Sequence, residues 1–332
     1  GEGEVVRPEG LPSDLSEDLQ TYFRSSRVFK AESANRIRAA AVSLRGARDY
    51  RTLVKLVGFL VEAGIGSADD EAIALAEELT TPMVASCLVA QIALSSDEEE
   101  RGRGAWTLSR IGPEGPIALR DALEESRERT ERRRLLDAFV TLGPAAYEMA
   151  GGMVLDSRWY VVRNGVTILG ELGGDKAKDL LMGTLANKDP RVRRESIMAL
   201  TKIGGPDAEA LVLGMLGDAA PQVRAAACRV LGAMGSQRAV KPILPLLKDK
   251  DQDTQIECLQ ALGHMADPAA VQPILKKAGG GVFSRPPRAV RIAAFRALAG
   301  IGTPEALRAV RKGMKDGDEE VRTVCKALIG VD

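Results

Sequence analysis

The chain has 332 residues and carries 46 basic and 46 acidic side chains, so its formal net charge is zero. A neutral chain has no general attraction for nucleic acid or for anionic membranes. Aromatic residues make up only 4 % of the chain, which favours closely packed helices and argues against a β-sandwich.

The first part of the chain is predicted to be helical without a clear repeat. It opens GEGEVV without a methionine, which we interpret as an expression-tag remnant or as a segment of a longer protein, and we expect residues 1–13 to be a disordered tail. Residues 14–96 are predicted to form a helical N-terminal cap or degenerate repeats, because KLVGFLVEAGIG (55–66) has a helix-plus-glycine ending.

The longest apolar stretch, 83–94, is too short to span a bilayer. Without a visible secretory signal, the sequence favours a cytoplasmic protein with no membrane insertion.

The second part, residues 97–332, is built on one returning pattern. DPRVRRESIMALTKIGG (189–205) is followed by APQVRAAACRVLGAMGS (220–236), 31 residues further on. A large apolar residue, the anchor, stands four positions before the glycine (once an alanine) that closes each copy. Anchors are 30 or 31 residues apart, except for the last interval of 36, and such a period predicts a stacked repeat protein. The anchors are Leu108, Phe139, Leu169, Leu200, Leu231, Leu262 and Leu298.

Each copy is predicted to form two helices. In the copy that starts at Asp189, this residue is a suitable N-cap, Pro190 opens the helix, and Gly204 with Gly205 ends it. Second helices are expected at ALVLGMLGD (210–218) and AVKPILPLLKDK (239–250), and a truncated copy begins at Asp318. One helix pair cannot bury its apolar face alone, so neighbouring pairs are expected to share a continuous core.

The motif D-P-x-V-R-x-x-x-x-x-A-L-x-x-I-G of residues 189–204 resembles the HEAT-like repeat of the phycobilisome-lyase type. The resemblance covers about residues 97–332. It implies an all-α fold, an α-solenoid of stacked antiparallel helix pairs, in which the V-R helices line the inner, concave surface. The family includes scaffolds, chromophore lyases and many uncharacterised proteins.

An arginine follows the first apolar residue of the repeated helix in six of eight copies. We predict that this arginine ladder is structural, with each guanidinium bridging to a carboxylate or a helix end in an adjacent repeat. The alternative is a basic ladder for a polyanion. The ladder consists of Arg101, Arg132, Arg193, Arg224, Arg291 and Arg322.

Residues that bind a partner are expected at exposed positions that differ between copies. The predicted concave stripe contains tryptophan and arginine, which are common anchors of protein interfaces. A five-residue insertion within KKAGGGVFSRPPRAVR (276–291) predicts a loop on the binding side. An ordinary solvated surface is the alternative for the stripe. The alternative for the loop is phosphate binding at Gly279–Gly281, although no Walker or dinucleotide spacing occurs there. The candidate partner-binding residues are Trp106, Arg134, Asn164, Met198, Arg229, Gln260 and Arg296 on the stripe, and Phe283, Arg285 and Arg288 in the loop.

Nothing in the sequence points to catalysis, a metal or a cofactor. The single histidine, His264, lies at a predicted solvent edge without an accompanying nucleophile motif. The four cysteines, Cys87, Cys228, Cys258 and Cys325, form no CxxC pair and are predicted to be reduced core residues. No zinc or calcium ligand pattern occurs. We therefore expect a protein that is not an enzyme, with no catalytic, metal-binding or cofactor-binding residues.

Three functions are compatible with the sequence. The favoured hypothesis is a scaffold that binds a partner protein or peptide on the concave face of the solenoid. A nucleic-acid-binding solenoid is the first alternative, because residues 276–316 carry ten basic side chains against two acidic ones. The second alternative, a bilin lyase or chromophore chaperone, is implied by the resemblance alone.

Overall fold

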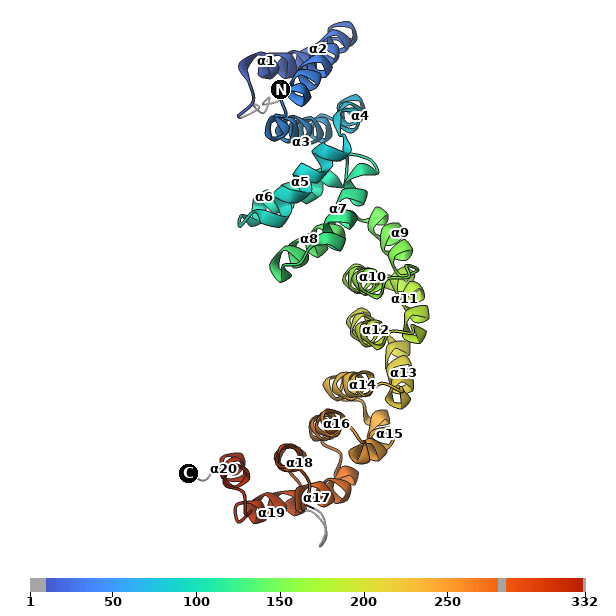
Figure 1. The fold of residues 1–332 in the computed structure, drawn as a ribbon, viewed down its shortest axis with the longest axis vertical. Helices are drawn as coiled ribbons and strands as arrows, with labels where there is room; N and C mark the ends of the chain where they lie inside the picture. Colours follow the sequence, from blue (N-terminus) through green and yellow to red (C-terminus); the bar gives the residue numbers. More distant parts are fainter. Residues whose placement is uncertain (1–9, 280–284, 331–332) are drawn as a thin grey trace. The chain divides into compact units, whose positions relative to one another are not determined.

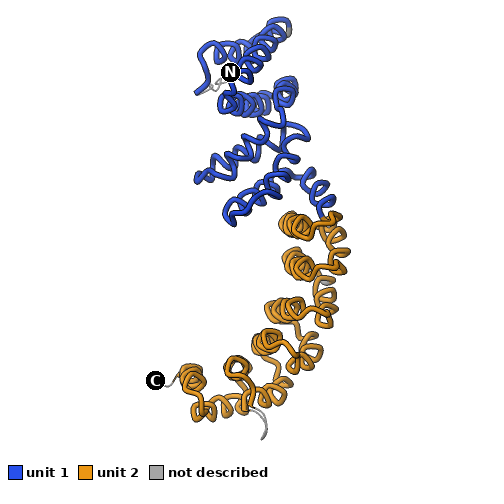
Figure 2. Tube along the Cα trace, viewed as in Figure 1, with its two compact units in different colours: residues 1–153 blue, residues 154–332 orange. Residues whose placement is uncertain are grey.

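The computed structural model describes residues 10–279 and 285–330, and within these ranges it contains helices and turns but no strand (Figure 1). The predicted all-α fold is confirmed. The chain forms two compact units, residues 1–153 and residues 154–332 (Figure 2). The first repeats predicted from the sequence therefore share a unit with the N-terminal helices, because helices on both sides of residue 97 pack on one another.

Unit 1 (residues 1–153) is a stack of helices with short connections. Asp49, Asp69, Thr81 and Asp97 each accept a backbone N–H of the helix that follows, which explains where these helices begin. The helices are α1 (Ser13–Arg24), α2 (Arg27–Gly46), α3 (Tyr50–Gly66), α4 (Asp70–Leu79), α5 (Pro82–Leu94), α6 (Glu98–Leu108), α7 (Glu114–Glu125), α8 (Arg129–Thr141) and α9 (Pro144–Met153).

Unit 2 (residues 154–332) contains the most regular repeats. Its α-helices are α10 (Trp159–Leu172), α11 (Gly174–Met182), α12 (Pro190–Ile203), α13 (Pro206–Gly214), α14 (Pro221–Ala233), α15 (Val240–Ile243), α16 (Gln252–Met265), α17 (Val271–Gly279), α18 (Arg288–Ile301), α19 (Pro304–Gly313) and α20 (Glu319–Leu328). Short 3-10 helices follow or precede some of them: η1 (Gly183–Ala186), η2 (Met215–Gly217), η3 (Gln237–Ala239), η4 (Leu244–Lys248) and η5 (Pro268–Ala270).

The helices of unit 2 form two rows. The even-numbered helices from α10 to α20 contact one another in succession and form the inner row, on the concave side of this unit (Figures 1 and 2). The odd-numbered helices form the outer row. The V-R helices of the repeat are thus the inner row.

The predicted signals for the ends of α12 are confirmed. The side chain of Asp189 accepts the backbone N–H of Arg191 at 2.9 Å, and Pro190 is the first residue of the helix. Gly204 follows the helix with a φ of 76°, a left-handed conformation that glycine adopts without a steric penalty. These local preferences set the length of the inner helix.

One predicted outer helix is broken. Residues 239–250 were expected to be a single helix, but the structure has η3, the four-residue α15 and η4 in this region. Pro242 and Pro245 lie here, and each lacks the N–H that a continuing α-helix needs. The outer row is therefore less regular than the inner row.

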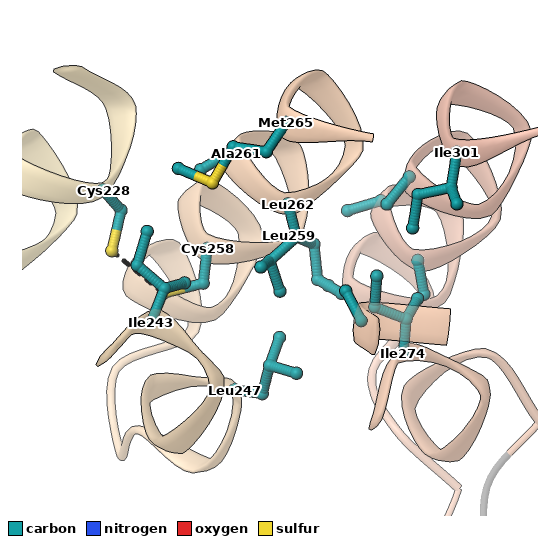
Figure 3. Close-up of a cluster of buried hydrophobic side chains, with 14 of the residues drawn as sticks. Cys228, Ile243, Leu247, Cys258, Leu259, Ala261, Leu262, Met265, Ile274 and Ile301 are labelled. Atoms are coloured by element: carbon teal, nitrogen blue, oxygen red, sulfur yellow. Dashed lines mark hydrogen bonds between the residues drawn. The ribbon is translucent and has the colours of Figure 1, made fainter. Parts of the chain in front are cut away.

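The anchors form the core, as the repeat predicts. All seven are at most 1 % exposed. Figure 3 shows part of this core in unit 2, where Leu259 and Leu262 of α16 pack between Ile243 of α15 and Ile274 of α17. Each layer thus buries the apolar side chains of the next, which is how a repeat array reaches stability.

The inner helices approach closely at small residues. A Cβ on Gly232 of α14 would lie 2.6 Å from the Cα of Ala261 on α16, and a Cβ on Gly170 would lie 2.8 Å from the Cβ of Ala199. Such distances leave no room for a methyl group. These glycines therefore bring neighbouring inner helices close together.

Candidate binding surfaces

The ladder arginines hold the loops that precede their own helices. Nη1 of Arg193 donates to the carbonyl oxygen of Asn187 at 2.8 Å, and Nη1 of Arg224 donates to that of Asp218 at 2.8 Å. In both cases the acceptor lies six residues earlier. The same bond joins Arg101 to Ser95, Arg132 to Ser126 and Arg322 to Asp316, and Arg291 donates to Pro286.

Three ladder arginines also reach a carboxylate in the following repeat. Arg193 donates two hydrogen bonds of 2.7 Å to Asp218, and Arg224 donates two of 2.7 Å to Asp249. Arg291 contacts Asp316 at 3.3 Å. The hydrogen bonds from Arg224 are the main reason that the pKa of Asp249 lies below its usual value. Arg193 and Arg224 thus have hydrogen-bond partners within unit 2, whereas Nε of Arg291 is buried and has no hydrogen-bond partner among the described residues.

Four residues of the predicted stripe are exposed at equivalent positions in unit 2. Met198, Arg229, Gln260 and Arg296 each stand two residues before an anchor, on α12, α14, α16 and α18. All four are exposed, and the side chain of Arg229 retains 59 % of its accessible surface. The structure therefore places these four in one line along the inner row.

Polar contacts cross this line from one helix to the next. Thr167 donates to Glu195 at 3.1 Å, and Arg229 donates to Glu257 at 2.5 and 3.1 Å. Arg194, one position after Arg193, is exposed and forms no ion pair with the described residues. Arg296 likewise has no ion pair there, so two cations of the inner row are available to a partner.

A small hollow of about 320 Å³ lies on this surface. Ala225 and Ala226 of α14 contribute only methyl groups to it, while its charged lining consists of Arg194, Arg229, Asp251, Asp253 and Glu257. The inner face of unit 2, defined by Arg194, Met198, Arg229, Gln260 and Arg296, thus combines exposed apolar and basic side chains with a shallow depression that three carboxylates also line.

Trp106 and Arg134 lie elsewhere, in unit 1. Trp106 on α6 lines a groove and has the guanidinium of Arg110 5.8 Å from its ring centre. Arg134 on α8 donates to the carbonyl oxygen of Ala93, the penultimate residue of α5, at 2.8 Å. Arg134 thus contacts the end of an earlier helix within unit 1, whereas the ladder arginines bond to the loop before their own helix.

The expected exposure of Asn164 is wrong. This residue is only 4 % exposed, because α10 is packed between its neighbours over most of its surface. Arg163 donates to its side-chain oxygen at 3.2 Å. A residue buried in this way offers no contact to a partner.

The insertion contributes two exposed arginines that already have acidic neighbours. Arg285 pairs with Asp316, and Arg288 lies 3.1 Å from Glu320 on α20. Phe283 lies outside the described residues. The pairing leaves little of the positive charge that the sequence suggested for this loop, because both contacts are to carboxylates of the next repeat.

The groove in unit 1 has a volume of about 1590 Å³ and is formed by α3, α5 and α6, together with Leu11 from the segment before α1. Its apolar lining includes Val54, Phe59 and Trp106, all half-buried. Its charged lining consists of Arg51, Lys55, Glu62, Glu99, Glu100 and Arg103. We call this surface the unit 1 groove.

Sequence reasoning missed this groove apart from Trp106. Gly58 on α3 and Gly102 on α6 line it, and an added Cβ would have no heavy atom closer than 4.0 Å at Gly58 and none within 4 Å at Gly102. Glycine inside a helix costs roughly 1 kcal/mol relative to alanine, so two such residues without close neighbours were a usable signal. The sequence interpretation treated only Gly66, at the end of α3, as informative.

Trp159 lies between two guanidinium groups. The guanidinium carbon of Arg191 is 3.4 Å from its ring centre and that of Arg163 is 5.4 Å away. Tyr160 packs against Trp159 edge to face, with 6.1 Å between ring centres. Cation–π contacts of this kind stabilise the corner between α10 and α12.

The prediction that all four cysteines are core residues is correct for three of them. Cys228, Cys258 and Cys325 are buried, and the sulfur atoms of Cys228 and Cys258 lie 3.1 Å apart (Figure 3). Cys87 is half-buried and lines the unit 1 groove, because it lies on the side of α5 that faces the groove. Burial raises the pKa of Cys87 above the usual thiol value.

The described residues contain no cluster of three or more histidine, cysteine or acidic side chains that could hold a metal ion. His264 is exposed, as predicted.

Among the described residues, no single helix is long and apolar enough to cross a membrane. The helices α4 and α5 reach that length and hydropathy only as a pair, and the pair is bent by 96°.

The comparisons with known proteins identify the repeat. Residues 153–219 and 208–279 match the family model of HEAT repeats. No curated protein sequence matches the chain.

Solved structures with similar folds are distant in sequence. YibA of Escherichia coli is 13 % identical, with 76 % of this chain and 96 % of that chain covered and a TM-score of 0.46. The complex of CpcE and CpcF of phycocyanin lyase from Nostoc sp. PCC7120 is 21 % identical over 75 % of this chain and 95 % of that chain, with a TM-score of 0.34. Kap95p, in a structure with RanGDP, is 13 % identical over 95 % and 48 %, with a TM-score of 0.46. These similarities assign no function to this chain.

Proposed function

We propose that this HEAT-like repeat protein is a non-enzymatic scaffold that binds a partner protein on the inner face of unit 2. The observation that carries the proposal is the line of Met198, Arg229, Gln260 and Arg296. These four residues occupy the same exposed position on consecutive inner helices and differ in chemistry from one copy to the next.

The contrast with the arginine ladder supports this assignment. Ladder side chains are the same in most copies, and those of unit 2 are used in contacts within the unit. A side chain that recurs in most repeats is expected to maintain the structure of the repeat. Exposed side chains that vary between repeats are free to match a partner.

The chemistry of the inner face fits a partner with both apolar and acidic groups. Met198 is 45 % exposed, and methionine adapts its shape to varied surfaces. Arg194 and Arg296 are exposed cations without an ion pair among the described residues. Arginine is also enriched among the residues that contribute most to protein interfaces.

Site-specific photo-crosslinking tests the proposal. A photoreactive amino acid is placed at Gln260 on the inner row or, as a matched control, at exposed Lys241 on the outer segment. After irradiation in nuclease-treated lysate of the source cells, a defined protein adduct is expected at position 260 and not at 241. The adduct should be lost in a chain that also carries Arg194→Glu and Arg296→Glu.

Two results would contradict the proposal. Equal adducts at positions 260 and 241 would mean that the inner face is not a preferred surface. An adduct at position 260 that persists with Arg194→Glu and Arg296→Glu would mean that the basic side chains of this face do not contribute to binding.

A further inference from the structure

The unit 1 groove is a second surface, independent of the inner face of unit 2. It is more than four times larger in volume than the hollow in unit 2, at about 1590 Å³ against 320 Å³. Pockets for small ligands usually measure roughly 300–1,000 Å³. Its size therefore suits a segment of polypeptide better than a metabolite.

Two glycines line the groove at positions where no close contact between helices requires a glycine. A Cβ on the neighbouring Gly104 would lie 2.9 Å from Ile92, so this glycine is required by the contact between α6 and α5. Gly58 and Gly102 have no such neighbour. Each of these glycines lowers the stability of its helix, and no close packing contact explains why it is there. What the two glycines provide is open space above α3 and α6.

Charges on α3 are ordered along the groove. Arg51 and Lys55 lie near the start of the helix and Glu62 lies near its end, and their spacing puts all three on the face that contains Gly58. The helix dipole favours the reverse order, with acidic groups first and basic groups last. Lys55 donates to the carbonyl oxygen of Gly10 at 3.3 Å. The side chains of Arg51 and Glu62 are exposed and form no ion pair with the described residues, so no ion pair among these residues offsets the order of their charges.

We propose that the unit 1 groove binds an amphipathic helix of a partner protein, with acidic side chains at one end of that helix and basic side chains at the other. The acidic end lies against Arg51 and Lys55, and the basic end lies against Glu62. Eleven residues separate Arg51 from Glu62, which corresponds to about 16 Å, or three turns of a docked helix. The apolar side chains of that helix contact Val54, Phe59 and Trp106.

The probes are two fluorescently labelled synthetic peptides of about four helical turns. Both carry a leucine stripe at helical spacing. The bipolar peptide has glutamates at one end and lysines at the other, whereas the acidic peptide has glutamates at both ends. Fluorescence anisotropy measures binding of each peptide to the full chain.

Cys87 supplies a second readout because it lines the groove and the other three cysteines are buried. A docked peptide should slow the reaction of Cys87 with a maleimide. This readout reports on the groove itself and is insensitive to a peptide that binds unit 2.

The wild-type chain is expected to prefer the bipolar peptide about threefold, because each exposed ion pair contributes roughly 0.2–1 kcal/mol. Glu62→Lys should reverse the preference in favour of the acidic peptide. The matched control Glu125→Lys, at an exposed residue at the end of α7 outside the groove, should retain the wild-type preference.

Gly102→Leu should weaken both peptides about tenfold or more, because leucine fills the groove. Leucine favours a helix more than glycine does, so the variant should remain folded, with a circular dichroism spectrum and a melting temperature at least equal to those of wild type. Gly58→Leu provides the same test on α3.

The proposal is overturned if neither peptide binds and slows the labelling of Cys87, or if both bind as tightly to the folded Gly102→Leu and Gly58→Leu chains. It is also overturned if Glu62→Lys leaves the preference unchanged, since the order of charges on α3 would then play no role. None of these results bears on the inner face of unit 2, whose crosslinking test uses other residues.

Discussion

The guanidinium of Arg224 donates two hydrogen bonds of 2.7 Å to the carboxylate of Asp249 in the next repeat. Arg224 also donates to the carbonyl oxygen of Asp218, whose carboxylate accepts two bonds from Arg193. Arg193, Asp218, Arg224 and Asp249 therefore form one connected series of contacts across repeat boundaries. This series stabilises the stacking of the layers in addition to the apolar core.

Removal of one member of the series should destabilise unit 2. Arg224→Ala leaves the carboxylate of Asp249, which is 6 % exposed, without its ion partner. We expect a loss of about 3 kcal/mol in the free energy of unfolding, measured by urea denaturation. Arg229→Ala removes an exposed arginine from the same helix and should cost less than about 1 kcal/mol. Equal losses for the two variants would contradict a structural role of Arg224.

The same series predicts sensitivity to acid. The hydrogen bonds from Arg224 hold the pKa of Asp249 below its usual value in the folded chain, whereas the unfolded value is about 3.9. The associated stability is present above about pH 3.9 and is lost as the pH falls through the lower, folded pKa. The difference in melting temperature between wild type and Asp249→Asn should therefore be largest near neutral pH and shrink below about pH 4.

Asp253→Asn is the control for this measurement. Asp253 lies on α16, is exposed and accepts no side-chain hydrogen bond from the described residues. The difference in melting temperature between Asp253→Asn and wild type should stay small at every pH. A constant difference for Asp249→Asn would show that its ionisation does not contribute to folding.

The repeat, and with it the fold, could be predicted from the sequence because its signals are local. Asp189 and Pro190 start a helix, Gly204 ends it, and Leu200 at the anchor position is buried, all within 16 residues. Each of these preferences acts over one or two helical turns. Their return at a fixed interval implies the stacked array without any knowledge of long-range contacts.

The binding surfaces could be predicted only in part, because they depend on contacts between helices. Met198 and Arg229 were placed on an exposed line by their offsets alone. Asn164 has an equally suitable offset, but α10 is buried over most of its surface, and a helical period cannot show this. The unit 1 groove requires α3 and α6 to lie beside α5, and these helices do not share the regular repeat.

Close packing of the inner row predicts opposite effects of two glycine-to-alanine changes. Gly232→Ala should lower the free energy of unfolding by about 1–3 kcal/mol, because the new methyl group would lie 2.6 Å from the Cα of Ala261. Gly102→Ala adds a methyl group with no neighbour within 4 Å and should raise stability by up to about 1 kcal/mol. Urea denaturation of both variants checks the prediction, and a loss of similar size at Gly102 would contradict it.

Thiol chemistry separates the groove from the core. In the native chain only Cys87 is expected to react with iodoacetamide, because Cys228, Cys258 and Cys325 are buried. Burial raises the pKa of Cys325 to about 11 and also raises that of Cys87, so the rate at Cys87 should rise with pH as the thiolate forms. Mass spectrometry of the alkylated peptides gives the rate at each site.

Two variants make this thiol measurement specific to the groove. Cys87→Ser should remove the fast phase and leave three thiols that react only when the chain unfolds in denaturant. Gly102→Leu should slow alkylation of Cys87 without changing the other three, because the leucine side chain enters the groove that Cys87 lines. Fast alkylation of Cys228 or Cys258 in native conditions would mean that the contact between α14 and α16 opens readily, contrary to the tight approach of Gly232 and Ala261.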